Sequence, residues 1–267
     1  MDIKVAVVVG VRGSLNTLRE WVEHYISLGF DKVIIYDNNL DCDAMDYLKG
    51  LEEHIICTKG NNQQLSTYNE AYRTHRKDFD WLAFFDDDEW LVLNKDKTIK
   101  EYLSRDIFNR VDCIHINWKV YGDNGHLHPT GEPTFVQFPE PCDPEVRTTY
   151  RWSQNYHIKS VVRCGKTIQF TNPHFCIPNN LVCVNNKGDR VQNGPFTPYN
   201  YELAELRHYQ LRSTEEFCRK RLGGRGKVMF DGYPITVANE ISWYFTYNER
   251  TPEKEQLIQD YLEGKWK

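Results

Sequence analysis

The sequence lacks an apolar run long enough to cross a bilayer as a helix, which takes about 20 consecutive apolar residues. The chain enters a hydrophobic stretch at Val5 with neither a charged leader nor a cleavage site ahead of it. We therefore expect no secretory signal and no transmembrane segment. The expected location is the cytoplasm, with membrane contact limited to a peripheral one at the inner face.

Positive charge is also in short supply. The chain has 33 Lys and Arg against 38 Asp and Glu, a formal net charge of −5. Without an excess of positive charge it has no bulk attraction for a polyanion. We therefore expect no nucleic-acid partner and look instead for a small or neutral one.

Two diagnostic sequence patterns are missing. The eight cysteines form no C-x-x-C pair, and a chain of 267 residues can bury a core without disulfides, so reduced thiols are expected, with disulfides as the alternative. The loop Gly10-Val11-Arg12-Gly13 matches neither G-x-G-x-x-G nor G-K-[ST]. Dinucleotide-binding and P-loop functions therefore lose their main support.

The most informative feature present is a run of four acids, Asp86 to Glu89, directly after the apolar stretch Trp81–Phe85. A short continuous apolar run is typical of a strand buried on both faces, so the acids should lie at the rim of a sheet. Two carboxylates about 5 Å apart repel by about 1–3 kcal/mol, and a divalent cation would reverse that energy. If the chain stays extended here, Asp86 and Asp88 project to one side as oxygen ligands. The alternative is a solvated acidic turn.

Strand-like and helix-like segments alternate before this run. Strands are expected at Val5–Val11, Val33–Tyr36, His54–Cys57 and Trp81–Phe85, with helices at Leu15–Ile26, Ala44–Leu51 and Leu65–Tyr72. The alternation predicts a parallel, doubly wound sheet, in which ligands bind beyond the carboxyl ends of the strands. Three such ends are polar. Arg12, between glycines, suits a phosphate or a base, and Asp37 with Asn38 suits a ribose or a nucleobase edge.

The rest of the chain is expected to extend the same sheet. Strands are predicted at Cys113–Val120, Ile158–Arg163 and Leu181–Asn185, and Ser213 with Glu216 matches the capping box of a helix. The sequence contains no Gly/Ser-rich or Pro-rich linker and no internal repeat. We therefore expect a loop-rich second half of one domain.

Several sequence blocks, in this order, resemble the family 2-like and family 92-like glycosyltransferases of the GT-A fold. They are Leu18–Tyr25, Ile35–Asn38, Tyr68–Ala71, Asp80–Leu91, Trp118–His126, Lys159–Arg163 and His208–Phe217. The resemblance implies a Rossmann-like, three-layer α/β sandwich with a mostly parallel mixed sheet. It also implies a nucleotide-sugar-binding half at 1–110 that ends in the D-x-D motif, an acceptor-binding and metal-completing half at 111–230, and a terminal tail at 231–267.

The activity that the resemblance implies is inverting hexosyl transfer in polysaccharide biosynthesis. The donor would be a UDP-type nucleotide sugar, with galactose the suggested sugar, and the acceptor a hydroxyl of a glycan or glycolipid. Mn²⁺ or Mg²⁺ would stabilise the charge left on the diphosphate.

The resemblance also implies roles for individual residues. The metal ligands would be Asp86, Asp88 and His208, and the catalytic base would be Asp123 or Glu132, with the choice left open. Acceptor-side residues would be Trp118, His126 and His174. Donor contacts would come from Val9, Arg12, Asp37, Asn38, Asp86, Asp87 and Arg225.

Two positions depart from the family pattern. Val11-Arg12-Gly13 stands where Asn-Glu is usual at the end of the first strand, and Cys164 replaces a proline. Two other functions stay open on this evidence. One is a metal-dependent nucleotidyl or phosphoryl transferase, and the other is a catalytically silent module that binds a glycan or a nucleotide sugar.

Overall fold

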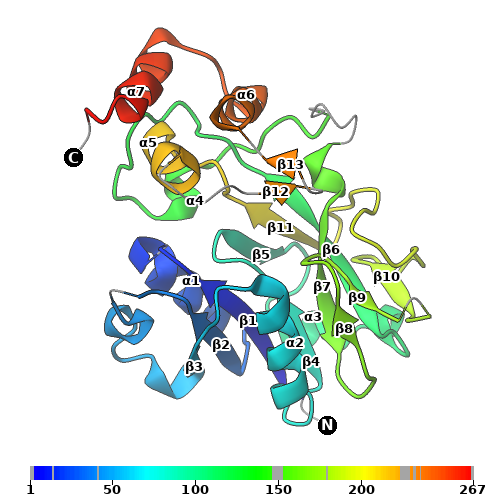
Figure 1. Cartoon of the computed structure of the whole chain (residues 1–267). Helices are drawn as coiled ribbons and strands as arrows, with labels where there is room; N and C mark the ends of the chain where they lie inside the picture. The colour runs from blue at the N-terminus through cyan, green and yellow to red at the C-terminus, as the bar shows by residue number, and fades with distance from the viewer. Residues whose placement is uncertain are drawn as a thin grey trace. The chain divides into compact units, whose positions relative to one another are not determined.

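The computed structural model describes residues 3–13, 15–40, 42–145, 153–178, 180–222, 229–230, 233–234 and 236–265. The chain forms two compact units, each built from separate segments (Figure 1). The first unit comprises Met1–Trp118 and Asn155–Arg207, and the second comprises Lys119–Gln154 and His208–Lys267. The functional segments expected at 1–110, 111–230 and 231–267 stay predictions.

A mixed sheet organises the first unit, with strand order β3-β2-β1-β4-β7-β6-β11-β5 and β10 beside β6. Strands β1 to β4 run parallel, and β7 is antiparallel to both β4 and β6. The strands are β1 (Val5–Val11), β2 (Lys32–Asp37), β3 (Ile55–Lys59), β4 (Trp81–Phe84), β5 (Glu89–Leu93), β6 (Cys113–Val120), β7 (Ile158–Arg163), β10 (Cys183–Asn185) and β11 (Ala204–His208), with a separate pair β8 (Gln169–Phe170) and β9 (Cys176–Ile177). This mostly parallel mixed sheet confirms the expected α/β fold class.

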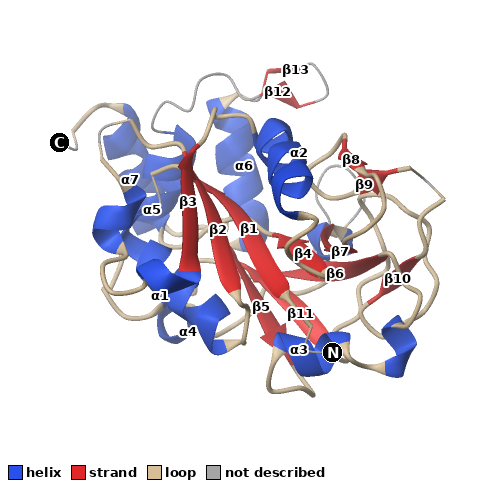
Figure 2. Cartoon of the chain, turned by 90° about the horizontal axis from the view of Figure 1, so that it is seen from below, coloured by secondary structure: helices blue, strands red, loops and turns tan. Residues whose placement is uncertain are grey.

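Helices cover both faces of the parallel strands (Figure 2). The helical segments of this unit are α1 (Leu15–Ser27), α2 (Gln64–His75), α3 (Ile99–Leu103) and 3-10 turns at Ala44–Tyr47, Glu52–His54 and Asp106–Phe108. The connection from β1 to β2 runs one way along the sheet and that from β3 to β4 runs the other. Right-handed crossovers therefore place α1 and α2 on opposite faces. Strand alternation agrees, since Ala6 and Val8 pack with Tyr68 of α2 in one buried cluster.

The carboxyl ends of β1, β2 and β3 are tied together by two asparagines. Asn39 Oδ1 accepts a hydrogen bond from Gly13 N at 2.8 Å, and Asn38 Oδ1 accepts one from Asn62 N at 2.8 Å. A side chain at position 60 would displace Asn38, because a Cβ there would lie 2.1 Å from Asn38 Oδ1. The polar ends of β1 and β2, which the sequence placed at one edge of the sheet, do lie together.

The second unit is mainly helical. It contains α4 (Thr134–Gln137), α5 (Thr214–Phe217), a π-helical turn (Cys218–Leu222), α6 (Val237–Tyr247), α7 (Pro252–Leu262) and the strand pair β12 (Met229–Phe230) and β13 (Tyr233–Pro234). Leu211, Phe217, Tyr244 and Ile258 form its buried core. The capping box expected at Ser213 and Glu216 is confirmed.

Local corrections to the sequence prediction are small. The helix expected at Ala44–Leu51 is a single 3-10 turn, the third strand begins at Ile55, and the strand expected from Leu181 begins at Cys183. The last strand is short because Leu181 N instead donates to Pro178 O at 3.4 Å in a turn. Within the described residues, every helix is too short or too polar to span a bilayer.

The side chain of Asn69 on α2 hydrogen-bonds the backbone of Phe170 as a neighbouring strand would. Its replacement should therefore lower the stability of the fold. Its Oδ1 accepts from Phe170 N at 2.7 Å and its Nδ2 donates to Phe170 O at 2.9 Å. We expect Asn69→Ala to lower the free energy of unfolding by about 2–3 kcal/mol, because both backbone groups of Phe170 lose their partner. The neighbouring exposed Glu70→Ala should change it by about 0.5 kcal/mol or less. Urea unfolding checks both, and equal effects of the two substitutions would contradict this role.

Candidate functional site

The four acids Asp86 to Glu89 form a turn between β4 and β5, called the acidic turn below. Glu89 N donates to Asp86 O at 3.1 Å, and Asp86 N donates to Glu89 Oε2 at 2.8 Å. The chain is therefore not extended here, and the condition under which Asp86 and Asp88 would project to one side is not met. Strand β5 begins directly at Glu89. Asp86 and Asp87 are partly exposed, whereas Asp88 is 6% exposed and Glu89 is fully buried.

A buried lysine neutralises part of the acidic turn. Lys159 of β7 has no exposed surface, and its Nζ lies 2.9 Å from Asp86 Oδ2 and 3.8 Å from Glu89 Oε1. Burial alone would lower the pKa of Lys159, but the two carboxylates raise it above its ordinary value. The lysine is therefore charged at neutral pH and holds both acids in place.

Asp86 is fixed on its other side by α2. Its Oδ1 accepts from Gln64 Nε2 at 2.5 Å and from Tyr68 OH at 2.9 Å. Lys159 Nζ in turn donates to Tyr68 OH at 3.3 Å. Since α2 and β7 both contribute, the orientation of Asp86 is set by the packing of two elements.

Glu89 connects the acidic turn to an aromatic group. Burial raises the pKa of Glu89 well above its ordinary range, with the Lys159 charge opposing that rise. Glu89 Oε1 accepts from Trp118 Nε1 at 2.7 Å. The Trp118 ring stacks on His157, with centroids 4.8 Å apart and planes 21° apart, and meets His174 edge-on at 5.1 Å. The structure thus brings together Trp118 and His174, which the sequence assigned to the acceptor side.

The predicted donor-side residues of the first unit differ in accessibility. Arg12 is exposed at the end of β1, whereas Val9 is completely buried inside the strand and can only support it. Asn38 bridges β2 and the loop after β3 as described above. Arg225 lies outside the described residues.

The carboxylate oxygens of Asp37 are occupied by contacts within the protein. Its carboxylate accepts from Lys59 Nζ at 2.6 Å, from Ala44 N at 3.1 Å and from both nitrogens of Asn39. Burial would raise the pKa of Asp37, but these bonds lower it below its ordinary value. Asp37 therefore holds the segment that follows β2.

The remaining predicted residues belong to the second unit. His208 ends β11, is 4% exposed, and its carbonyl accepts from Tyr121 N at 3.1 Å. Metal binding by Asp88 with His208 stays a prediction. Glu132 is exposed in a loop, and the ring of His126 meets Phe138 edge-on at 5.8 Å.

Asp123 lies in a cavity of about 480 Å³ within the second unit, which His126 and Lys254 also line. Its Oδ2 pairs with Lys254 Nζ at 2.6 Å and accepts a hydrogen bond from Tyr244 OH, while Oδ1 accepts from Gly125 N at 2.8 Å. Burial and this carboxylate raise the pKa of Tyr244 far above its ordinary value. The contacts of Asp123 are those of a structural ion pair.

Sequence reasoning missed the parts played by Lys159, Glu89 and His157. A signal existed for Lys159, because it interrupts the apolar strand Ile158–Val162. A lysine in a doubly buried strand needs a carboxylate partner, and the acidic turn was the obvious source. No comparable signal marks His157, which only the fold brings onto Trp118.

Removing the Lys159 charge should destabilise the chain in a pH-dependent way. We expect Lys159→Met to lower the free energy of unfolding by about 3–5 kcal/mol at pH 7.5, because a buried carboxylate loses its partner. The raised pKa of Glu89 sets the sign: protonation of Glu89 is favoured in the folded state. The cost should therefore shrink toward pH 5 and grow as the pH rises.

The matched control is Lys166→Met, which removes a 2.7 Å pair with Asp112 from a side chain that is 56% exposed. Its cost should stay below about 1 kcal/mol at both pH values. Urea unfolding at pH 5 and pH 7.5 measures both variants. A cost of Lys159→Met that is independent of pH would contradict the assignment.

The glycosyltransferase family 92 model matches residues 5–219, and no curated protein matches the sequence. Among solved structures, TarS of S. aureus aligns with a TM-score of 0.37 at 14% identity, over 60% of this chain and 28% of that one. A cytidylyltransferase of Leptospira borgpetersenii serovar Hardjo-bovis aligns with a TM-score of 0.30 at 11% identity, over 49% and 58%.

The chain thus spans less than two thirds of either neighbour, and both structural likenesses are distant. The family match, in contrast, covers β1 to the start of the π-helical turn and includes the acidic turn and Lys159. On that match, the chain belongs to glycosyltransferase family 92.

Proposed function

We propose that the chain is an inverting, metal-dependent hexosyltransferase that moves a sugar from a UDP-sugar to a hydroxyl of a glycan or glycolipid. UDP-galactose is the proposed donor. The supporting observation is the gathering of four acids in one turn at the carboxyl edge of the sheet. Asp86, Asp87, Asp88 and Glu89 are consecutive there, and Lys159 is buried against Asp86 and Glu89.

The proposed metal ligands are Asp86, Asp88 and His208. Oxygen ligands from Asp86 and Asp88, with the imidazole of His208 as a third ligand, suit Mn²⁺ or Mg²⁺. Once bound, the metal would supply Lewis-acid stabilisation of the diphosphate leaving group. Lys159, Gln64 and Tyr68 take three of the roughly four lone-pair sites of the Asp86 carboxylate, which leaves one site for the metal.

The first unit also offers groups for the rest of the donor. Arg12 is an exposed cation at the same edge and would bind a phosphate oxygen. Asp37 would act by holding the loop in which Asn38 faces the nucleotide, because its own oxygens are occupied. The stacked rings of Trp118 and His157 would pack against a sugar.

Inversion also needs a carboxylate to accept the proton of the acceptor hydroxyl. Of the two candidates, Asp123 already forms an ion pair with Lys254 and accepts hydrogen bonds from Tyr244 and Gly125. Glu132 is exposed. We therefore assign the role of base to Glu132 and a structural role to Asp123.

Donor binding should depend on Asp88. Thermal unfolding of the wild type with Mn²⁺ and each of several nucleotide sugars should show selective stabilisation by UDP-sugars, reaching about 2.7 kcal/mol at 100 times the Kd. Asp88→Ala should abolish this stabilisation and the metal-dependent turnover of the donor. Asp78→Ala, which removes an exposed acid after α2, should leave the stabilisation and the turnover unchanged.

Each other outcome of this experiment has a definite meaning. Retention of metal-dependent binding and turnover in Asp88→Ala would refute the ligand assignment. Binding without any turnover would indicate a silent module. Transfer of a nucleotidyl or phosphoryl group without a sugar acceptor would indicate the alternative transferase.

Substitution of Glu132 should lower activity, whereas substitution of Asp123 should lower stability. Glu132→Gln should lower kcat by about 10²- to 10⁴-fold, the usual contribution of a general base, with the unfolding temperature unchanged. Asp123→Asn should lower the free energy of unfolding by about 2–5 kcal/mol, because Lys254 is left without its buried partner. Steady-state kinetics and thermal unfolding decide the question. Full activity in Glu132→Gln would exclude Glu132 as the base.

A further inference from the structure

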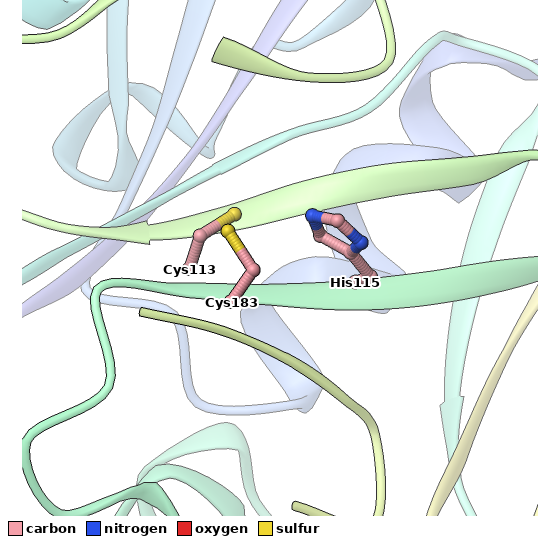
Figure 3. Close-up of side chains that lie close together, drawn as sticks. All are labelled: Cys113, His115 and Cys183. Carbon is pink, nitrogen blue, oxygen red and sulfur yellow. The ribbon is translucent and has the colours of Figure 1, made fainter. Parts of the chain in front are cut away.

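Two cysteines and a histidine, residue types that bind soft metal ions, lie together inside the first unit. None of them belongs to the acidic turn. Cys113 and His115 are two residues apart on β6, so strand alternation places their side chains on one face. Cys183 of β10 pairs in register with Cys113, which brings its side chain to the same face. Figure 3 shows the two sulfur atoms side by side with the imidazole turned toward them.

The spacing of these ligand atoms suits a single ion. One atom from each of the three residues lies within 4.8 Å of the other two. In a tetrahedral zinc site, metal distances of about 2.3 Å to sulfur and 2.0 Å to nitrogen put the ligand atoms about 3.5–3.8 Å apart. Small side-chain movements would shorten the distances between the ligand atoms to those of a zinc site.

His115 is already oriented as a metal ligand. It is fully buried, and its Nδ1 lies 3.3 Å from the hydroxyl of Thr197. Within the part of the chain that the structure describes, its Nε2 is buried without a hydrogen-bond partner. A ligating histidine commonly binds the metal through one ring nitrogen while a hydrogen bond at the other fixes the ring. Thr197 supplies that second contact.

Cys176 of β9 is the candidate for a fourth ligand. The thiol of Cys113 also interacts with that of Cys176 on β9, and all three cysteines belong to one buried apolar cluster. Apolar surroundings favour a soft, closed thiolate site over one that holds water. Hydrogen bonds with neighbouring thiols, together with burial, raise the pKa of Cys113 and Cys183, so without a metal these thiols stay protonated.

We propose that Cys113, Cys183 and His115, with Cys176 as the fourth ligand, bind one structural zinc ion. Each cysteine that binds releases its thiol proton, and His115 binds as the neutral imidazole. The ion links β6, β9 and β10. It thereby anchors the loop-rich stretch that follows β7, where the strands are only two or three residues long. This inference does not depend on the proposed transferase activity.

Metal analysis of the purified full chain tests the proposal. After desalting we expect about one zinc per chain, reduced at least tenfold in His115→Gln and in Cys183→Ser. Cys164→Ser removes a cysteine beside the cluster that is not assigned as a ligand, and Asp88→Ala alters the acidic turn; both should keep the zinc. A site at the acidic turn would give the opposite pattern.

A second measurement covers the case in which a cluster variant fails to fold. Cobalt-substituted wild-type protein should show the intense visible bands of tetrahedral cobalt and a sulfur-to-cobalt charge-transfer band, and zinc should displace both. Lack of zinc together with lack of these bands would overturn the proposal. So would a Cys113–Cys183 disulfide found by peptide mass spectrometry without reduction, or full zinc retention by folded His115→Gln and Cys183→Ser.

Discussion

The first unit depends on one buried cation placed beneath a cluster of acids. A lysine ammonium without exposed surface is costly to desolvate, and it is tolerated at Lys159 because Asp86 and Glu89 lie against it. The dependence is mutual, since Glu89 is equally buried. From this pair the contacts extend to Tyr68 and Gln64 of α2 and to Trp118 of β6. Strand, helix and turn are thereby fixed by the same charges.

The sequence was sufficient to predict the elements that follow simple periodicity. The strand Val5–Val11, the helix from Leu15, the strand Ile158–Arg163 and the Ser213 capping box all appear where they were expected. These segments have uniform local signals, and nearby tertiary contacts agree with them. The gathering of polar strand ends at one edge also followed from the parallel topology alone.

The geometry of the acidic turn was beyond such reasoning. Alternation assumes that a strand continues, whereas Asp86 to Glu89 reverse direction because two backbone amides find partners within the turn. Asp37 was expected to face a ligand, and its oxygens are instead taken by Lys59 and its own loop. Pairings such as Trp118 with Glu89, or Asp123 with Lys254, join residues 29 and more than 100 positions apart. One sequence read alone contains no signal for them.

The chain crosses between its two units after Trp118, after Gln154 and after Arg207. On a ribosome, the first unit can be completed once Arg207 has emerged, while the second must wait for the segment from His208 onward. The residues from Lys119 to Gln154 are thus synthesised early but acquire their core partners, such as Tyr244 and Lys254, last. A simple truncation therefore cannot yield either unit free of a segment of the other.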